Sequence, residues 1–108
     1  MTRKSKIEAG TGNIFADLGR PDSDVHFLKA QIVSELYRLT VERELTQTRA
    51  GKRMGISQPE VSRLFKGHFR EYSIERLMGF LTAFDRDVEI TVRAGKKGSG
   101  RIIFAAAA

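Results

Sequence analysis

The stretch from Leu45 to Gly67 constrains the fold of this 108-residue chain most strongly, because it has the pattern of two short helices joined by a tight turn. Thr46 is suited to cap the first helix, and Gly55 to end it, since glycine adopts a left-handed backbone without steric cost. Ser57 is suited to cap the second helix. The apolar residues recur at spacings that turn both helices toward a common core: Ala50, Met54, Ile56, Val61, Leu64 and Phe65. The pattern predicts a helix-turn-helix whose second helix has a free outer face.

Two further helices flank this pair. Acidic and hydroxyl residues at 22–24 are candidate caps for a helix that ends near Glu44, and its apolar positions recur every three or four residues: Leu28, Ile32, Leu36 and Leu39. After Gly67, Ser73 is suited to cap a last helix, whose core positions are Ile74, Leu77, Met78, Leu81 and Phe84. The sequence therefore predicts a mainly α-helical domain over residues 22–86.

The positive charge of the chain is concentrated on the helix-turn-helix. Nineteen Lys and Arg against thirteen Asp and Glu give a net charge of +6. Residues 45–70 hold six basic residues and one acidic residue, a net +5, whereas residues 22–44 carry a net −2. Such an excess is either a solvated face or a surface for an anionic partner. Its place on this motif favours double-stranded DNA.

Beyond the last helix, the hydrophobic period changes from 3.6 to 2. Val88, Ile90 and Val92 alternate with polar residues, and a glycine-rich loop at 95–100 leads to a second apolar stretch at 101–104. This pattern is typical of a β-strand or hairpin. An isolated hairpin is marginal in water, so it must either pair with the hairpin of a second copy or fold back on its own helices. We expect residues 87–108 to be a dimerisation element.

Residues 1–21 are rich in Lys, Ser, Gly and Thr and contain one apolar patch at 14–18. We expect a flexible N-terminal arm, which is either an ordinary frayed terminus, a basic arm that touches DNA phosphates, or a segment that docks on a partner. The arm lacks the apolar centre of a signal peptide, and no apolar run is long enough to span a bilayer. Since the chain also has no cysteine, a cytoplasmic location is expected.

Residues 28–84 resemble the DNA-binding domain of the phage-repressor/Cro superfamily, also called the XRE family. In that family a glutamine opens the first helix of the pair and another lies near the start of the second, and Gln47 and Gln58 have the same placement. The resemblance implies a λ-repressor-like bundle of four to five helices, here followed by the C-terminal strand or hairpin. It also implies that Gln47 bonds a phosphate and braces Gln58 at a base edge. Independently, an amide offers the donor and the acceptor that match adenine N7 and N6.

The other predicted DNA-binding residues lie on the outer side of the same helices. Arg63, one turn beyond Gln58, can reach guanine O6 and N7, with a phosphate contact or an internal ion pair as alternatives. Lys66 is expected at a phosphate, as is either Lys52 or Arg53. The full predicted set is Thr46, Gln47, Lys52, Arg53, Ser57, Gln58, Pro59, Ser62, Arg63 and Lys66.

Two residues depart from the family pattern. Gly51 lies inside the first helix, where glycine costs roughly 1 kcal/mol relative to alanine. Pro59 lies in the first turn of the second helix, where its missing N–H breaks no helical bond but its side chain cannot donate to DNA. Glu60 is spaced with Ser57 as a capping box, which is a structural role. The departures at Gly51 and Pro59 affect which bases the protein recognises rather than whether it binds DNA.

The whole layout, with an arm from Gly12 to Gly19, also resembles small chromosomal regulators related to the antitoxins of toxin–antitoxin pairs. That resemblance implies autoregulation and a toxin protein as a further partner, whereas the alternative is a free-standing repressor. A helical protein-interaction module that does not bind DNA is the other class considered. We expect neither an enzyme nor a cofactor, because His26 and His68 have no neighbouring groups in the sequence that would complete a triad or a metal site.

Overall fold

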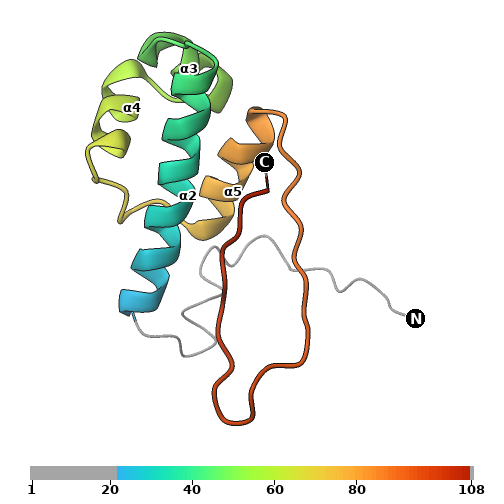
Figure 1. Cartoon of the computed structure of the whole chain (residues 1–108). Helices are drawn as coiled ribbons and strands as arrows, with labels where there is room; N and C mark the ends of the chain where they lie inside the picture. Colours follow the sequence, from blue (N-terminus) through green and yellow to red (C-terminus); the bar gives the residue numbers. More distant parts are fainter. Residues whose placement is uncertain (1–21, 108) are drawn as a thin grey trace.

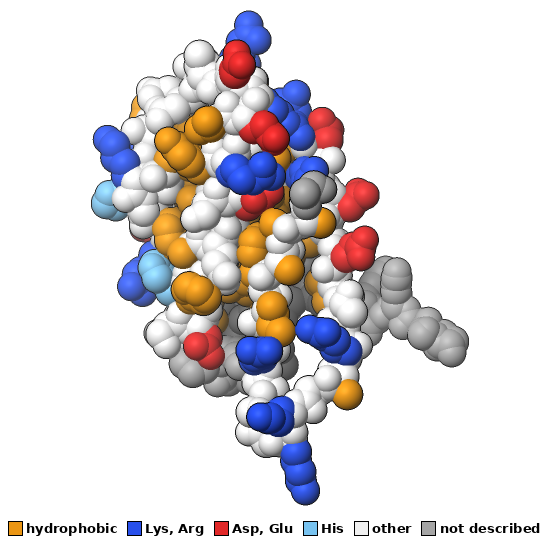
Figure 2. Space-filling view, in the orientation of Figure 1, with side chains coloured by type: hydrophobic (Ala, Val, Ile, Leu, Met, Phe, Trp, Pro, Cys, Tyr) orange, Lys and Arg blue, Asp and Glu red, His pale blue; other side chains and the backbone are white. Residues whose placement is uncertain are grey.

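The computed structural model describes residues 22–107, which form four helices. Helix α2 spans Asp22–Glu42, α3 spans Gln47–Met54, α4 spans Gln58–Phe65 and α5 spans Ile74–Ala83. Figure 1 shows α2 as the long central helix, with α3 near its carboxyl end, α4 on one side and α5 on the other. In the same orientation, Figure 2 shows Lys and Arg side chains where α4 lies and hydrophobic side chains over α2. The predicted mainly helical fold is confirmed.

The two ends of α3 and the start of α5 lie where single residues predicted them. At the start of α3, Thr46 Oγ1 accepts a hydrogen bond from the N–H of Arg49 at 3.1 Å, and Gly55 ends the helix with a φ of +78°. At the start of α5, Ser73 Oγ accepts a hydrogen bond from the N–H of Arg76 at 3.0 Å. These ends could be predicted because each cap is a contact within one helical turn.

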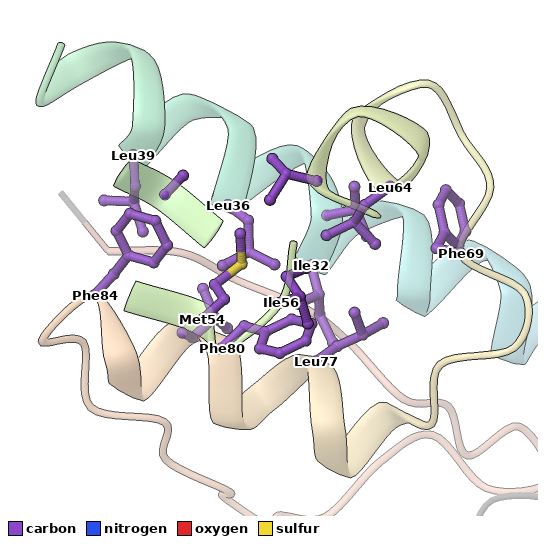
Figure 3. Close-up of a cluster of buried hydrophobic side chains, with 14 of the residues drawn as sticks. Ile32, Leu36, Leu39, Met54, Ile56, Leu64, Phe69, Leu77, Phe80 and Phe84 are labelled. Atoms are coloured by element: carbon purple, nitrogen blue, oxygen red, sulfur yellow. The ribbon is translucent and has the colours of Figure 1, made fainter. Parts of the chain in front are cut away.

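The hydrophobic core is formed by the inward sides of all four helices. Its largest fully buried side chains are Phe84, Leu36, Leu39, Leu64, Leu77 and Val61. Figure 3 shows side chains of α2, α4 and α5 meeting Met54 of α3 and Ile56 of the turn that follows it. Burial of each such large side chain stabilises the fold by roughly 1.5–3 kcal/mol. Among the predicted core residues of the helix-turn-helix, Phe65 is partly buried and packs edge-on against Tyr37.

The predicted C-terminal β-strand or hairpin is not confirmed. Residues 86–107 contain no strand, and Figure 1 shows them as two extended arms joined by a turn. Within this described segment the one backbone hydrogen bond joins Ser99 N–H to Lys96 O, at the turn. Ile90 and Val92 are 68% and 91% exposed, so the alternating pattern has no surface to pack on. A lone pair of strands is marginal in water, and residues 22–107 offer no third strand to pair with it.

The described residues leave one part of the prediction open. The expected N-terminal arm, residues 1–21 with the apolar patch at 14–18, lies outside them. The helical domain predicted for residues 22–86 corresponds to α2 through α5 and the turn that follows α5.

Gly51, which departs from the family pattern, is required by the turn between α3 and α4. Gly51 is buried, and a Cβ added to it would lie 2.5 Å from the carbonyl oxygen of Ile56. Its own carbonyl oxygen accepts hydrogen bonds from the N–H groups of Gly55 at 2.7 Å and Ile56 at 3.0 Å. The chain therefore folds back onto Gly51 as it leaves α3, and only a residue without a side chain leaves room for it.

We expect the substitution Gly51→Ala to lower the free energy of unfolding by about 1 to 3 kcal/mol, because a backbone carbonyl cannot retreat as a flexible side chain can. Gly79, exposed in the interior of α5, is the matched control, since an added Cβ there would meet nothing within 4 Å. Gly79→Ala should stabilise the fold by up to about 1 kcal/mol through helix propensity. Urea denaturation followed by circular dichroism measures both. Equal stabilisation by the two substitutions would contradict this account of Gly51.

Candidate nucleic-acid interface

A complete capping box fixes the start of α4. The N–H of Ser57 donates to Glu60 Oε1 at 2.9 Å, and the N–H of Glu60 donates to Ser57 Oγ at 3.3 Å. The Ser57 hydroxyl also donates to Glu60 Oε1, at 3.1 Å. The two hydrogen bonds to the carboxylate, first that from the Ser57 N–H and then that from its hydroxyl, lower the pKa of Glu60 below its ordinary value. The Glu60 carboxylate, which lies next to the predicted DNA surface, is therefore hydrogen-bonded at the start of α4. The structural role predicted for Glu60 is confirmed.

Gln47 and Gln58 meet across the turn. Gln58 Nε2 donates a hydrogen bond to Gln47 Oε1 at 2.7 Å, although the two residues lie on different helices. Gln58 is exposed, and this bond uses one N–H of its amide, so the second N–H and the carbonyl oxygen can bond another group. The arrangement holds the Gln58 amide at the amino end of α4, as bracing by Gln47 requires.

The outer side of α4 carries the other predicted residues of that helix. Val61 and Leu64 are buried on the inner side, so at 100° per residue the opposite side holds Pro59, Ser62, Arg63 and Lys66. Arg63 and Lys66 are exposed, and neither cation forms an ion pair or a side-chain hydrogen bond with another described residue. Ser62 is partly buried at the edge of this side. The unpaired cations can therefore meet an anionic partner without breaking a contact of the fold.

On α3, the structure separates the two cations that the sequence left as alternatives. Lys52 is exposed and has no ion-pair partner among the described residues. Arg53 instead donates a hydrogen bond to the carbonyl oxygen of Ala83 at 3.3 Å and lies 3.5 Å from a carboxylate oxygen of Asp85. The Arg53 side chain therefore belongs to the contact between α3 and the end of α5, which its spacing from Gln47 could not reveal. Thr46 is exposed, and its hydroxyl caps α3.

The described residues contain no group of three or more His, Cys, Asp or Glu that could hold a metal ion. His26 stacks on Phe69, with ring centres 4.9 Å apart, and His68 is exposed directly after α4. No helix in the described part of the chain has the length and apolarity needed to cross a bilayer.

Comparison with known proteins agrees with this geometry. A family model described as a helix-turn-helix domain matches residues 14–93, which include all four described helices. A solved structure named "Putative XRE Family Transcriptional Regulator" is 36% identical, with a TM-score of 0.76, and the match covers 81% of this chain and all of that one. The chain belongs to the XRE-like helix-turn-helix family. No curated protein matches the chain. Within this family fold, α3 and α4 are the helix-turn-helix pair.

The capping box makes a testable contribution to stability. Because the pKa of Glu60 is lowered in the folded state, its ionised carboxylate stabilises the fold above its ordinary pKa, and this contribution is lost as the pH falls through the folded-state pKa. Glu60→Gln should therefore melt at a lower temperature than the wild type at pH 7, and the gap should narrow at acidic pH. Thermal melts from pH 7 to pH 3 measure this gap, with Glu89→Gln as a control for the loss of one charge. A gap for Glu60→Gln that stays constant across this range would contradict the role of its carboxylate.

Proposed function

We propose that this protein is a sequence-specific regulator that binds double-stranded DNA and represses transcription as a dimer on an inverted-repeat operator. The observation that carries the proposal is the Gln47–Gln58 hydrogen bond, which holds an amide at the amino end of α4, while Arg63 and Lys66 further along the helix form no ion pair with another described residue. An α-helix fits the major groove, where an amide can read adenine. The family of the chain supports the same function.

The proposed contacts divide into those that read bases and those that hold phosphates. Gln58 reads adenine, and Arg63, about 7.5 Å further along the axis of α4, reads guanine with two parallel hydrogen bonds. Lys66, at the end of α4, and Lys52, on α3, bind phosphates and position the helix without reading sequence. Arg53 is left out of the phosphate contacts because it already holds the end of α5.

The remaining predicted residues lie around these contacts. Gln47 bonds a phosphate while it braces Gln58, and Ser62 meets either a phosphate or a base. Thr46 and Ser57 lie at the amino ends of α3 and α4, where the positive end of the helix dipole favours a phosphate. Pro59 shapes the surface next to Gln58 without donating a hydrogen bond.

Binding should weaken steeply with salt, because each neutralised phosphate releases counterions. Gln58→Ala and Arg63→Ala should each cost about 1 to 3 kcal/mol and relax preference at particular base pairs, whereas Lys66→Ala should weaken all sequences alike and lower the salt slope by about 1. Sites selected from a random duplex library, titrated at several salt concentrations and against single mismatches, provide the measurement.

Two outcomes would contradict this assignment. Affinity that does not change with salt would point to a protein-interaction module in place of a DNA-binding protein. If Arg63→Ala matched Lys66→Ala across the mismatch panel, Arg63 would be a phosphate contact rather than a base-reading residue.

The exposed C-terminal arms support the proposed dimer. Ile90, Val92, Ile102 and Ile103 are all exposed, and their extended backbone leaves N–H and C=O groups open to a partner strand. In a two-fold dimer each arm can pair with the arm of the other copy, which supplies partner strands that the described residues of one copy do not form. Two copies of α4 on one axis address half-sites about 34 Å apart, or one helical turn of DNA.

Truncation after Arg86 should leave a folded helical domain that sediments as a monomer and has lost most of its affinity for the full inverted repeat. The helical core should survive because, among the described hydrophobic residues that are removed, Phe104 alone packs against it, and Phe104 is only partly buried. Analytical ultracentrifugation and binding to full and half sites measure the two effects. A truncated protein that still dimerises and binds with undiminished affinity would place the interface on the helices instead.

We propose an antitoxin-type repressor as a second candidate. Beyond the resemblance of the layout, α2 exposes Phe27, Tyr37 and Val41 to solvent at 54–64%, a hydrophobic face that binding to DNA does not use (Figure 2). Such faces mark contacts with other proteins. Co-expression with the product of an adjacent gene distinguishes the candidates, since an antitoxin would relieve growth arrest caused by that product.

A further inference from the structure

A cluster at the carboxyl end of α5 joins parts of the chain that lie far apart in the sequence. It consists of Arg43, Arg53, Phe84 and Asp85, and we call it the arginine junction. Arg43 follows α2, Arg53 lies in the last turn of α3, and Phe84 and Asp85 follow α5. The junction therefore connects the helix-turn-helix to the point where the C-terminal segment begins.

Both guanidinium groups bond carbonyl oxygens at the end of α5. Arg43 Nη2 donates to Phe84 O at 2.6 Å, and Arg53 Nη1 donates to Ala83 O at 3.3 Å. The last carbonyl groups of a helix have no partner inside it and form the negative end of its dipole, so cations stabilise them. The same guanidinium groups lie over the buried Phe84 ring, with their Cζ atoms 5.5 and 5.8 Å from its centre.

Asp85 adds a carboxylate between the two cations. Its Oδ2 lies 3.8 Å from Arg43 Nη1 and 3.5 Å from Arg53 Nη1. Its backbone has a φ of +64°, in the left-handed region that glycine adopts most readily and that aspartate and asparagine also adopt. The Asp85 side chain is 79% exposed, so it places a solvent-facing negative charge between the two guanidinium groups.

Both arms of the C-terminal segment meet the helical domain at this point. Arg86 is the first residue beyond the junction, and its N–H bonds Leu81 O at 3.2 Å, which fixes the direction in which the first arm leaves α5. Arg86 Nη2 donates to Ala107 O at 3.0 Å and ties the returning arm to the same place. The two ends of the C-terminal segment are thus attached next to the contact by which Arg53 holds α5 to α3.

We infer that the arginine junction determines which spacing of half-sites this protein reads, with Arg43 and Arg53 as positioning residues. The inference rests on the proposed function, in which residues 87–107 join two copies and α4 of each copy enters the DNA. The junction is then the link between the dimer interface and the recognition helix. A rigid link holds two α4 helices at one separation, whereas a loose link allows several separations and loses the gain from binding both half-sites together.

The test compares full-length wild type with Arg43→Gln, Arg53→Gln and the double variant. The DNA probes are the selected inverted repeat, the same repeat with its spacer lengthened or shortened by one and two base pairs, and a single half-site. Arg49→Gln is the matched control, because Arg49 is an exposed cation on α3 whose side chain bonds no other described residue. Asp85→Gly is a further variant that removes the carboxylate and relieves the backbone, so it should fold at least as well as the wild type.

We expect the wild type to prefer its best spacing over the two-base-pair changes by on the order of tenfold or more. The double variant and Asp85→Gly should bind the half-site within about twofold of the wild type, because α4 is intact. The double variant should show a nearly flat dependence on spacing, whereas Asp85→Gly, which keeps the bonds of Arg43 and Arg53 to the carbonyl oxygens, should show a weaker preference than the wild type. Arg49→Gln should keep the sharp preference.

The outcomes separate this inference from the proposed function. If the wild type prefers one spacing and Asp85→Gly and the double variant prefer it as sharply, the junction does not set the spacing and the inference is wrong, while the proposed function stands. If the wild type binds DNA but prefers no spacing, the proposed dimer on an inverted repeat fails, and the inference fails with it. Loss of half-site binding by Asp85→Gly would also overturn the inference, since the junction would then act on the fold of α3 and α4 rather than on their separation.

Discussion

The close approach of the chain to Gly51 is the constraint on which the helix-turn-helix depends. The Gly51 carbonyl oxygen accepts the N–H groups of Gly55 and Ile56, and the Ile56 carbonyl oxygen lies where a Cβ of residue 51 would be. This contact sets the angle at which α4 leaves the turn. This angle brings Gln58 Nε2 to 2.7 Å from Gln47 Oε1 and leaves the outer side of α4 exposed. The position of the candidate DNA surface thus depends on the backbone contact between Gly51 in α3 and Ile56 in the turn that follows.

Apart from the pairing of Gln47 with Gln58, which the family resemblance implied, the features that the sequence predicted have a physical cause within one helical turn. Thr46 and Ser73 cap their helices through bonds to residues three positions on, and Ser57 with Glu60 forms a reciprocal pair at the same spacing. The apolar period likewise reports which side of a helix is buried. At Gly51 the sequence alone indicates only a loss of helix propensity, because the carbonyl group that requires glycine there belongs to Ile56 in the turn after α3, and the pattern of residue types does not encode that approach.

Features that depend on distant or absent partners could not be predicted in the same way. Arg53 is separated by 30 residues from the Ala83 carbonyl that it bonds, and nothing in the spacing of charges distinguishes it from Lys52. The alternation of Val88, Ile90 and Val92 has the period of a strand, yet a strand also needs an edge to pair with, and the described chain supplies none. A local pattern therefore indicates what a segment can form, while its neighbours decide whether it does.

Because Arg53 bonds the end of α5, the net charge of the helix-turn-helix is larger than the charge that is available to a DNA partner. The sequence assigns +5 to residues 45–70, but Arg53 faces Asp85, which lies outside that range, and its guanidinium group already bonds the end of α5. The cations that remain without an ion-pair partner among the described residues of α3 and α4 include Lys52, Arg63 and Lys66. Since counterion release follows the phosphates that are actually neutralised, the contacts proposed above make the salt dependence of binding a property of Lys52 and Lys66 rather than of the total charge. The neighbouring cations Lys52 and Arg53 therefore differ in their contacts. Lys52 faces solvent, whereas Arg53 bonds the end of α5, where the C-terminal segment begins.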